Sequence, residues 1–458
     1  VGGVVLKKEM LLVEKEERML IKYTLLDAHS PTKIRLQPFL AFRNIHALTK
    51  ANLDVNTKYK VVSNGIKIKM YEGFPSLYMQ TSKKSEYIHV PDWYYNIEYP
   101  LEQQRGYEYS EDLFVPGYFE MTIKKDEPIV FSAGTSEATT SSLTRQFISE
   151  VQKRIPRNSF MNCLENSAQQ FISRKNGKTK IIAGFPWFGH WARDTIISLP
   201  GLTLALNKPD LFFEVIDTML SEVKKCFFQS EGDYTSSGKD SADAPLWFFW
   251  AFQKYLEYDP KFDVWKTYGK KLKEIIGCYK RGTDFKIKMH DNYLIWAGDG
   301  NKALTWMDAY VSDKPVTPRT GFAVEINALW YNAVCFALEL AKKANDKEFV
   351  SEWQELPELI KASFTATFWD SSKGYLADYV NYDEKNWQVR PNMLFAASLP
   401  YSPIENDIKK SVIDIIKKEL LTPRGLRTLS PKDIEYKGLY ESNEIERNLA
   451  YHQGTVRT

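Results

Sequence analysis

The chain has few cysteines and no long apolar run. Its 458 residues include 4 Cys and 6 His, and the cysteines are far apart, so their spacing indicates neither a zinc site nor a disulfide framework. We therefore expect Cys163, Cys226, Cys278 and Cys335 to be reduced residues of a cytoplasmic protein. No apolar run approaches the roughly 20 residues that span a bilayer, so we expect no transmembrane helix.

Neither sign of charge dominates. The sequence has 61 Lys and Arg against 58 Asp and Glu, a formal net charge of +3, and the two signs are well mixed. A chain without a basic stripe or an acidic tract gives no argument for nucleic acid or for a solvating tail. We expect no nucleic-acid partner, no membrane partner, no cofactor and no bound metal.

Aromatic residues, in contrast, are abundant. They make up 14% of the chain, with 12 Trp, 26 Tyr and 26 Phe. This is more than a core needs, and stacking on the apolar faces of sugar rings is one use for such a surplus.

Residues 1–135 alternate between apolar and polar positions with a period of two. The runs are short, rich in β-branched and aromatic residues, and bounded by Gly, Pro, Asn or Ser, and Asn64-Gly65 is a favourable hairpin turn. This pattern predicts an antiparallel β-sandwich. Residues 93–113 are too polar and aromatic for a plain hairpin, so we expect a long loop there. The opening Val1-Gly2-Gly3, which runs directly into strand-like sequence, indicates a chain truncated at its N-terminus.

After a connector at 136–150, the apolar period changes to 3.6 and stays so to residue 458, which predicts a helical domain over 151–458. About ten helices joined by short loops suggest a toroid of inner and outer helices around a central pocket. The predicted helices cover 145–174, 194–207, 209–228, 243–258, 262–281, 322–344, 347–368, 391–399 and 404–421, with another beginning near 449.

The most informative stretch is 183–203. Trp187 and Trp191 precede the pair Arg193-Asp194, which falls in the first turn of a predicted helix. Tryptophans can stack on a sugar ring while a forked cation and a carboxylate bind its hydroxyls. The alternative is a loop with core tryptophans and an internal Arg-Asp ion pair.

Other helix starts repeat this mixture of polar and aromatic residues. Asp243 precedes Trp247, with the alternative of a capping Asp and a core Trp. Further along the chain, the same kind of helix start is indicated by Arg390 with Asn392 and by His452 with Gln453.

A candidate acid lies between two of the predicted helices. Asp308 follows Trp306 and Met307, and an apolar setting raises the pKa of a carboxyl group, as a general acid requires. The alternative is an aspartate in a turn. Glu325 shares the pocket in one interpretation, and caps its helix or pairs with Arg319 in the other.

These residues resemble the glucosidase part of glycogen debranching enzymes, the amylo-α-1,6-glucosidase family. The resemblance rests on blocks that occur in order over about 180–458: Ala183-Gly184-Phe185-Pro186-Trp187-Phe188, Arg193-Asp194-Thr195, Asp243-Ala244-Pro245-Leu246-Trp247, Thr305-Trp306-Met307-Asp308, Pro318-Arg319, Val324-Glu325-Ile326-Asn327, Arg390-Pro391-Asn392 and Tyr451-His452-Gln453-Gly454. The N-terminal half also resembles that of the family.

The resemblance implies an (α/α)6 barrel that removes the α-1,6-linked glucose at branch points of glycogen or limit dextrin, or acts on malto-oligosaccharide, with inversion. It implies that Asp308 is the general acid and that Arg193 and Asp194 bind the terminal glucose. The remaining substrate-binding candidates are Trp187, Trp191, Asp243, Trp247, Trp306, Arg319, Glu325, Arg390, Asn392, His452 and Gln453.

Two departures from the family pattern matter. Ala192 stands where the family has Gly, and the chain stops at Thr458, where the family continues with a Trp-Pro-Trp run and two further helices. Inversion needs a second carboxylate roughly 6.5 to 9.5 Å from the acid, which the resemblance places beyond Thr458. We therefore expect a barrel that lacks its last helices, and we name no general base. Without that base, we expect this fragment to be inactive.

Two rival functions stay open. One is a related enzyme on the same scaffold, an exo-acting α-1,4-glucosidase or a disaccharide phosphorylase, the latter needing a basic phosphate subsite. The other is a non-catalytic glucan-binding protein.

Overall fold

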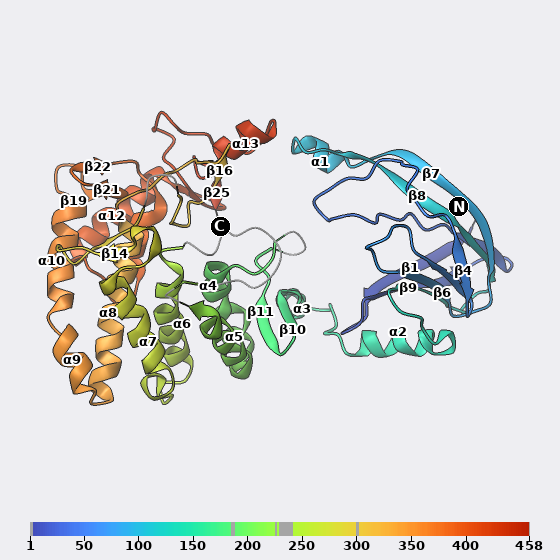
Figure 1. Ribbon diagram of the computed structural model, residues 1–458, viewed down its shortest axis with the longest axis horizontal. Coiled ribbons are helices and arrows are strands. Elements are labelled where there is room, and N and C mark those ends of the chain that lie inside the picture. Colours follow the sequence, from blue (N-terminus) through green and yellow to red (C-terminus); the bar gives the residue numbers. More distant parts are fainter. Residues whose placement is uncertain (1–2, 185–187, 225–226, 229–240, 299–301, 458) are drawn as a thin grey trace. The chain divides into compact units, whose positions relative to one another are not determined.

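The chain forms two compact units, Val1–Asn166 and Ser167–Thr458. The computed structural model describes residues 3–184, 188–224, 227–228, 241–298 and 302–457. Each unit is described by itself below (Figure 1).

The first unit contains two antiparallel sheets over one hydrophobic core (Figure 1). Phe119 and Phe131, one from each sheet, meet with their ring centroids 5.5 Å apart. The six-stranded sheet has the order β1 (Val5–Leu12), β2 (Arg18–Asp27), β9 (Ile129–Gly134), β6 (Leu77–Thr81), β5 (Gly65–Ile68), β4 (Tyr59–Val62), and the three-stranded sheet β3 (Thr32–Leu36), β8 (Ser110–Ile123), β7 (Glu86–Glu98). The predicted antiparallel sheets of this half are therefore confirmed.

The loop predicted over 93–113 is wrong. The strands β7 and β8 pair as one long hairpin, with the short helix α1 (Pro100–Gln104) at its tip. Trp93 is directed inward, where it packs edge-on against Phe114 with ring centroids 5.5 Å apart. Because β7 is an edge strand, most of its side chains are exposed, which is why the apolar alternation is weak.

The hairpin predicted at Asn64-Gly65 is present, with its turn one residue earlier. Val62 pairs with Gly65, so Ser63 and Asn64 form the two-residue turn, and Asn64 has φ 46°. Gly65 is already in β5, where a Cβ atom would lie 2.1 Å from the backbone oxygen of Met79. Glycine is needed there because β6 passes so close.

Helix α2 (Leu143–Gln152) packs on the six-stranded sheet through Leu143 and Phe147, which share a small core with Leu20 and Val130. These contacts place α2 in the first unit. The helix predicted over 145–174 is divided, because Pro156 lies between α2 and α3 (Phe160–Gln170).

The second unit is a helical region with small β-hairpins between its helices (Figure 1). Its longer helices are α4 (Ala192–Leu202), α5 (Pro209–Glu222), α6 (Ala244–Tyr258), α7 (Val264–Arg281), α8 (Val324–Lys343), α10 (Leu356–Phe368) and α12 (Asn406–Glu419). The shorter ones are α9 (Lys347–Trp353), α11 (Leu394–Ser398) and α13 (Glu444–Ala450).

Helices α4, α6, α8 and α11 contact one another in succession, while α5, α7, α10 and α12 each contact members of that row. Helix α8 is the centre of the core, because almost every residue from Val324 to Leu338 is buried. The row therefore forms an inner layer. The predicted helix over 347–368 is divided into α9 and α10, and Pro357 lies in the first turn of α10.

The prediction of a helix beginning near 449 is wrong, because a helix ends there. Helix α13 runs from Glu444 to Ala450, and Asn443 caps its start by accepting a hydrogen bond from the backbone N–H of Glu446. The segment beyond it turns through positive φ at His452 and Gly454, which a helix does not allow.

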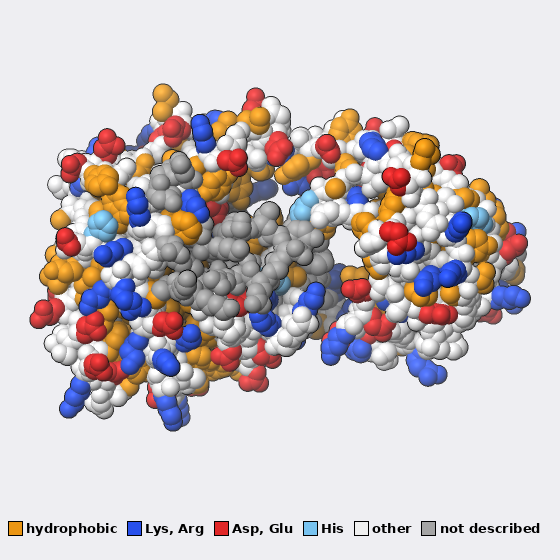
Figure 2. Space-filling model, viewed as in Figure 1, with side chains coloured by type: hydrophobic (Ala, Val, Ile, Leu, Met, Phe, Trp, Pro, Cys, Tyr) orange, Lys and Arg blue, Asp and Glu red, His pale blue; other side chains and the backbone are white. Residues whose placement is uncertain are grey.

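Cys163 and Cys335 are reduced thiols, as predicted. Cys278 is disulfide-bonded, which corrects the prediction of a reduced thiol there, and Cys226 lies outside the described residues. No helix among the described residues is long and apolar enough to cross a membrane. Figure 2 shows Lys and Arg interspersed with Asp and Glu on the visible face of each unit.

Replacing Gly65 by Ala tests the close approach of β5 and β6. Overpacking against the Met79 backbone should lower the free energy of unfolding by about 2–3 kcal/mol, measured by thermal unfolding followed by circular dichroism. Gly201→Ala in α4 is the control, because no atom lies within 4 Å of its added Cβ, and it should be neutral or slightly stabilising. Equal effects of the two changes would contradict this packing.

Candidate active site

The site is centred on Arg193, in the first turn of α4. Its guanidinium makes a bidentate contact with Asp243, from Nε to Oδ2 at 2.7 Å and from Nη2 to Oδ1 at 2.9 Å. Nη2 also donates to Ser241 Oγ at 2.7 Å, and Nη1 donates to Asp308 Oδ2 at 3.3 Å. One side chain thus joins three segments that are far apart in the sequence.

Asp243 is a buried carboxylate that remains ionised. It stands at the N-cap of α6, but its side chain accepts hydrogen bonds from Arg193, Ser241 and Trp247, the last from Nε1 at 3.0 Å. Burial by itself raises the pKa of Asp243, and the charge and hydrogen bonds of Arg193 outweigh burial and lower it.

Trp247 is itself in the core. It is buried and packs edge-on against Phe395 with ring centroids 5.5 Å apart. Its indole N–H therefore donates to the Asp243 carboxylate, while its ring packs in the core between α6 and Phe395.

Asp308 has the opposite electrostatic setting. It lies in the loop between β15 (Ile295–Trp296) and β16 (Tyr310–Val311), and 17% of its side chain is exposed. Burial raises the pKa of Asp308, the nearby Arg193 lowers it by less, and the Asp243 charge raises it further. Two carboxyl groups therefore share one guanidinium and have pKa values displaced in opposite directions. In such a pair, the group with the raised pKa, Asp308, can act as an acid, while the group with the lowered pKa, Asp243, stays an anion.

His452 lies beside Asp308, with Nε2 4.0 Å from Oδ1. Its ring also meets that of Trp306 edge-on, at a centroid distance of 5.0 Å.

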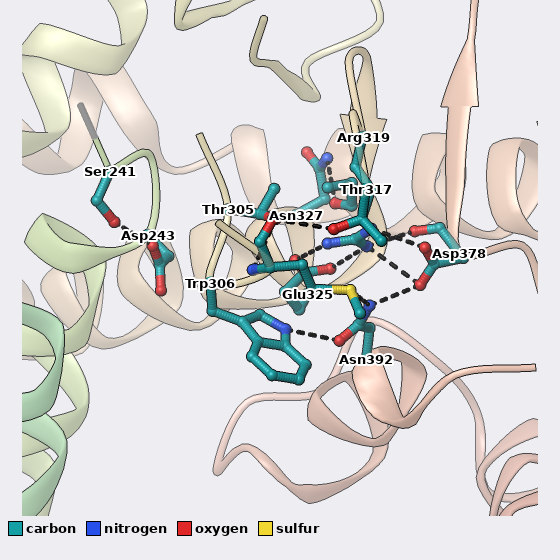
Figure 3. A network of polar contacts seen from close by, with 12 residues as sticks. Ser241, Asp243, Thr305, Trp306, Thr317, Arg319, Glu325, Asn327, Asp378 and Asn392 are labelled. Atoms are coloured by element: carbon teal, nitrogen blue, oxygen red, sulfur yellow. Dashed lines mark hydrogen bonds and ion pairs between the residues drawn. The ribbon is translucent and has the colours of Figure 1, made fainter. Parts of the chain in front are cut away.

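A second polar network surrounds Arg319 (Figure 3). Its guanidinium donates to both oxygens of Glu325 and, through Nε at 2.7 Å, to Asp378 Oδ2. Asp378 also accepts from Asn392 Nδ2 at 2.7 Å, and Asn392 Oδ1 accepts from Trp306 Nε1 at 2.7 Å. Glu325 is therefore bound to Arg319, one of the two interpretations that its sequence position allowed.

Arg390 is fully engaged by the protein. Its N–H groups donate to Gln388 Oε1, to the carbonyl oxygens of Thr428 and His452, and to Gln453 Oε1 at 2.8 Å. These are five donated hydrogen bonds, which is the full capacity of a guanidinium. Arg390 thus fixes the segment that carries His452 and Gln453.

The remaining candidates lie at the edge of this cluster. The side chain of Asp194 is exposed, and Trp191, at the N-cap of α4, is partly buried. Trp187 lies outside the described residues. Among the described residues, no group of His, Cys, Asp and Glu could hold a metal ion.

Two residues of the site are not among those predicted from the sequence. Ser241 lies two residues before Asp243 without a motif of its own, and Asp378 precedes β21 (Tyr379–Asn381) in a stretch with no motif. Spacing could not have revealed Asp378, because only the fold brings it to Arg319 and Asn392.

The fold is similar to that of a bacterial glucoamylase solved in complex with acarbose. The likeness has a TM-score of 0.56 at 11% sequence identity and covers 99% of this chain and 72% of that one. The likeness shows that this chain shares the fold of that glucoamylase.

Two family descriptions match the chain. Residues 166–458 match amylo-alpha-1,6-glucosidase, and residues 1–130 match the N-terminal part of glycogen debranching enzyme. The chain therefore belongs to the amylo-alpha-1,6-glucosidase family of glycogen debranching enzymes.

A relative in Saccharomyces cerevisiae is described as a glycogen debranching enzyme. It is 24% identical over 400 aligned residues, which take in 64% of this chain and 26% of the relative. The chain thus spans about a quarter of the length of the curated relative it matches.

The opposite pKa displacements predict opposite effects of two isosteric changes. Because the folded-state pKa of Asp308 lies above its unfolded value, ionising Asp308 costs folding free energy as pH rises through that pKa. Asp308→Asn should therefore stabilise the protein at pH 7, by on the order of 1 kcal/mol. This gain should vanish in acid, where Asp308 of the wild type is protonated.

Asp243→Asn is the matched comparison. The lowered pKa of Asp243 contributes stability that is present above the unfolded pKa and lost as pH falls through the folded one. The change should destabilise the protein at pH 7 by about 3–5 kcal/mol, since Arg193, whose side chain is only 13% exposed, loses its main partner. Thermal unfolding from pH 3 to 8 measures both, and effects of the same sign at pH 7 would refute the assignment.

Proposed function

We propose that this chain carries the glucosidase site of a glycogen debranching enzyme, which hydrolyses the α-1,6-linked glucose at branch points of glycogen or limit dextrin with inversion. Asp308 acts as the general acid that protonates the glycosidic oxygen. Arg193 and Asp194 bind the terminal glucose. The observation that carries the proposal is the pair of carboxyl groups on Arg193, one held ionised and one poised to keep its proton.

The chemistry of the pair supports these roles. Asp243 neutralises Arg193 through two short hydrogen bonds, so Arg193 stabilises the Asp308 anion only in part. Asp308 therefore holds its proton to higher pH than an ordinary aspartate. When that proton passes to the glycosidic oxygen, the Asp308 anion is left beside Arg193. We assign no residue to the role of general base.

We further propose that the helical region belongs to an (α/α)6 barrel, with α4, α6, α8 and α11 as inner helices. This is supported by the contacts of the inner layer and by the start of α4, which brings Arg193 to the cluster that also holds Asp243, just ahead of α6. We place the first unit as a β-sandwich and the whole protein in the cytoplasm, where glycogen is degraded.

The state of the basic groups favours a hydrolase over a phosphorylase. Arg193 and Arg319 are each bound to two carboxylates, and Arg390 donates all its hydrogen bonds to protein acceptors. Binding phosphate to Arg319 or Arg390 would therefore break a buried contact. Arg193 uses four of its five N–H groups in these contacts, which leaves one donor for a sugar hydroxyl but no pair of donors for phosphate.

Asp308→Asn in the full-length enzyme should abolish hydrolysis of an α-1,6-linked glucose while sparing glucose binding, because the leaving oxygen then lacks its proton donor. α-Glucosyl fluoride, whose leaving group needs little protonation, should be hydrolysed far better by this variant than the natural branch. Proton NMR of the wild-type reaction should show β-glucose first. The appearance of α-glucose first, or full activity of Asp308→Asn on branched dextrin, would refute the mechanism.

Asp194→Asn tests the glucose contact. It should lower turnover by on the order of 100-fold, since a charge-assisted hydrogen bond to the sugar is lost, with little change in melting temperature because the side chain is exposed. Asp210→Asn is the control, since Asp210 is an exposed acid in the first turn of the next helix, α5. A loss of activity that only parallels a loss of stability would make Asp194 a structural residue.

A further inference from the structure

Asn392 links the loop that carries Asp308 to a buried carboxylate (Figure 3). It is fully buried, and its Oδ1 accepts from Trp306 Nε1 at 2.7 Å. Its Nδ2 donates to Asp378 Oδ1 at 2.7 Å and contacts Met307 Sδ at 3.4 Å. Asn392 thus contacts both residues that immediately precede Asp308.

The chemistry of the two partners allows one orientation of the Asn392 amide. An indole N–H only donates and an ionised carboxylate only accepts, so the amide oxygen must face Trp306 and the amide nitrogen must face Asp378. A flipped amide would break both hydrogen bonds, and Asn392 and Asp378 are both buried. Asp378 therefore selects the orientation that presents an acceptor to Trp306.

Asp378 is itself rigidly held. It is 1% exposed, and Arg319 donates to its side chain from Nε at 2.7 Å and from Nη2 at 3.2 Å, and to its carbonyl oxygen at 2.9 Å. The backbone N–H of Val324, the first residue of α8, donates to the same carbonyl. The carboxylate is thus fixed to the start of the central helix.

We infer that Asp378 is a positioning residue of the active site, which acts through Asn392 to fix the indole of Trp306 and the 305–308 loop beside Asp308. The inference rests on the proposed function. Met307 is additionally held by Thr317, whose hydroxyl donates to its carbonyl at 3.1 Å. The 305–308 loop is therefore held at two points, by Thr317 at the Met307 carbonyl and by Asn392 at the Trp306 indole. Asp378 acts on the second point, where the Trp306 ring also contacts His452.

The indole N–H signals of the 12 tryptophans, observed by NMR in the nitrogen-15 labelled chain, test this directly. Loss of a signal in Trp306→Phe identifies Trp306. In Asp378→Asn, which does not touch Trp306, that signal should move upfield as its hydrogen bond weakens. The signal of Trp330, whose Nε1 donates to the Tyr293 carbonyl at 3.2 Å, should stay in place as the internal control.

Glu325→Gln is the matched variant, because it removes a charge from the same Arg319 but leaves the bond between Asp378 and Asn392 untouched. It should leave the Trp306 signal unmoved. If Asp378→Asn does not fold, Asn392→Asp breaks the same bond from the other side and should also move the signal. An unmoved signal in a folded variant, or an equal shift in Glu325→Gln, would overturn the inference.

Binding of the glucose-shaped amine 1-deoxynojirimycin, measured by calorimetry, gives the second readout. Its Kd should rise about five- to tenfold in Asp378→Asn, the loss typical of one weakened hydrogen bond. An unchanged Kd beside a shifted Trp306 signal would overturn the positioning role. Absence of binding to the wild type would count against the proposed function, and the NMR result would then decide the inference alone.

Discussion

The bidentate contact between Arg193 and Asp243 is the interaction on which the site depends. A buried guanidinium is tolerated only when its charge and its donors are matched, and here the match comes from Asp243 and Ser241 on one side and Asp308 on the other. Because these residues come from three separate segments, the contact also aligns α4, α6 and the 305–308 loop. The ion pair between Arg193 and Asp243 thus holds three segments together and also keeps Asp243 ionised.

The two buried arginine networks divide the work of the site. Around Arg193, two carboxyl groups share one cation. Burial raises the pKa of Asp308 by more than Arg193 lowers it, and the charge of Asp243 raises it further. Around Arg319, two carboxylates and an amide hold Trp306 and the loop in place. Such networks cost desolvation energy. In return, they fix the side chains in one arrangement, which apolar packing alone would not specify.

Much of this arrangement could be predicted from the sequence, because local signals mark helix starts. Arg193 in the first turn of α4, Asp243 ahead of α6 and Pro391 before α11 all follow from capping and proline patterns. The pairing of the strands β7 and β8 escaped prediction, since an exposed edge strand has little apolar alternation. Nor could the sequence predict Asp378 or the engagement of all five N–H groups of Arg390, because both depend on long-range contacts.

Asp308 holds its proton to higher pH than Asp243, because the pKa of Asp308 is raised and that of Asp243 is lowered. The most direct measurement is a pH titration of the aspartate side-chain carboxyl signals by carbon-13 NMR in the labelled chain, with Asp308→Asn and Asp243→Asn used to assign the two signals. The account predicts that Asp308 titrates above and Asp243 below the ordinary aspartate pKa of about 3.9. An Asp308 midpoint at or below that of Asp243 would contradict it.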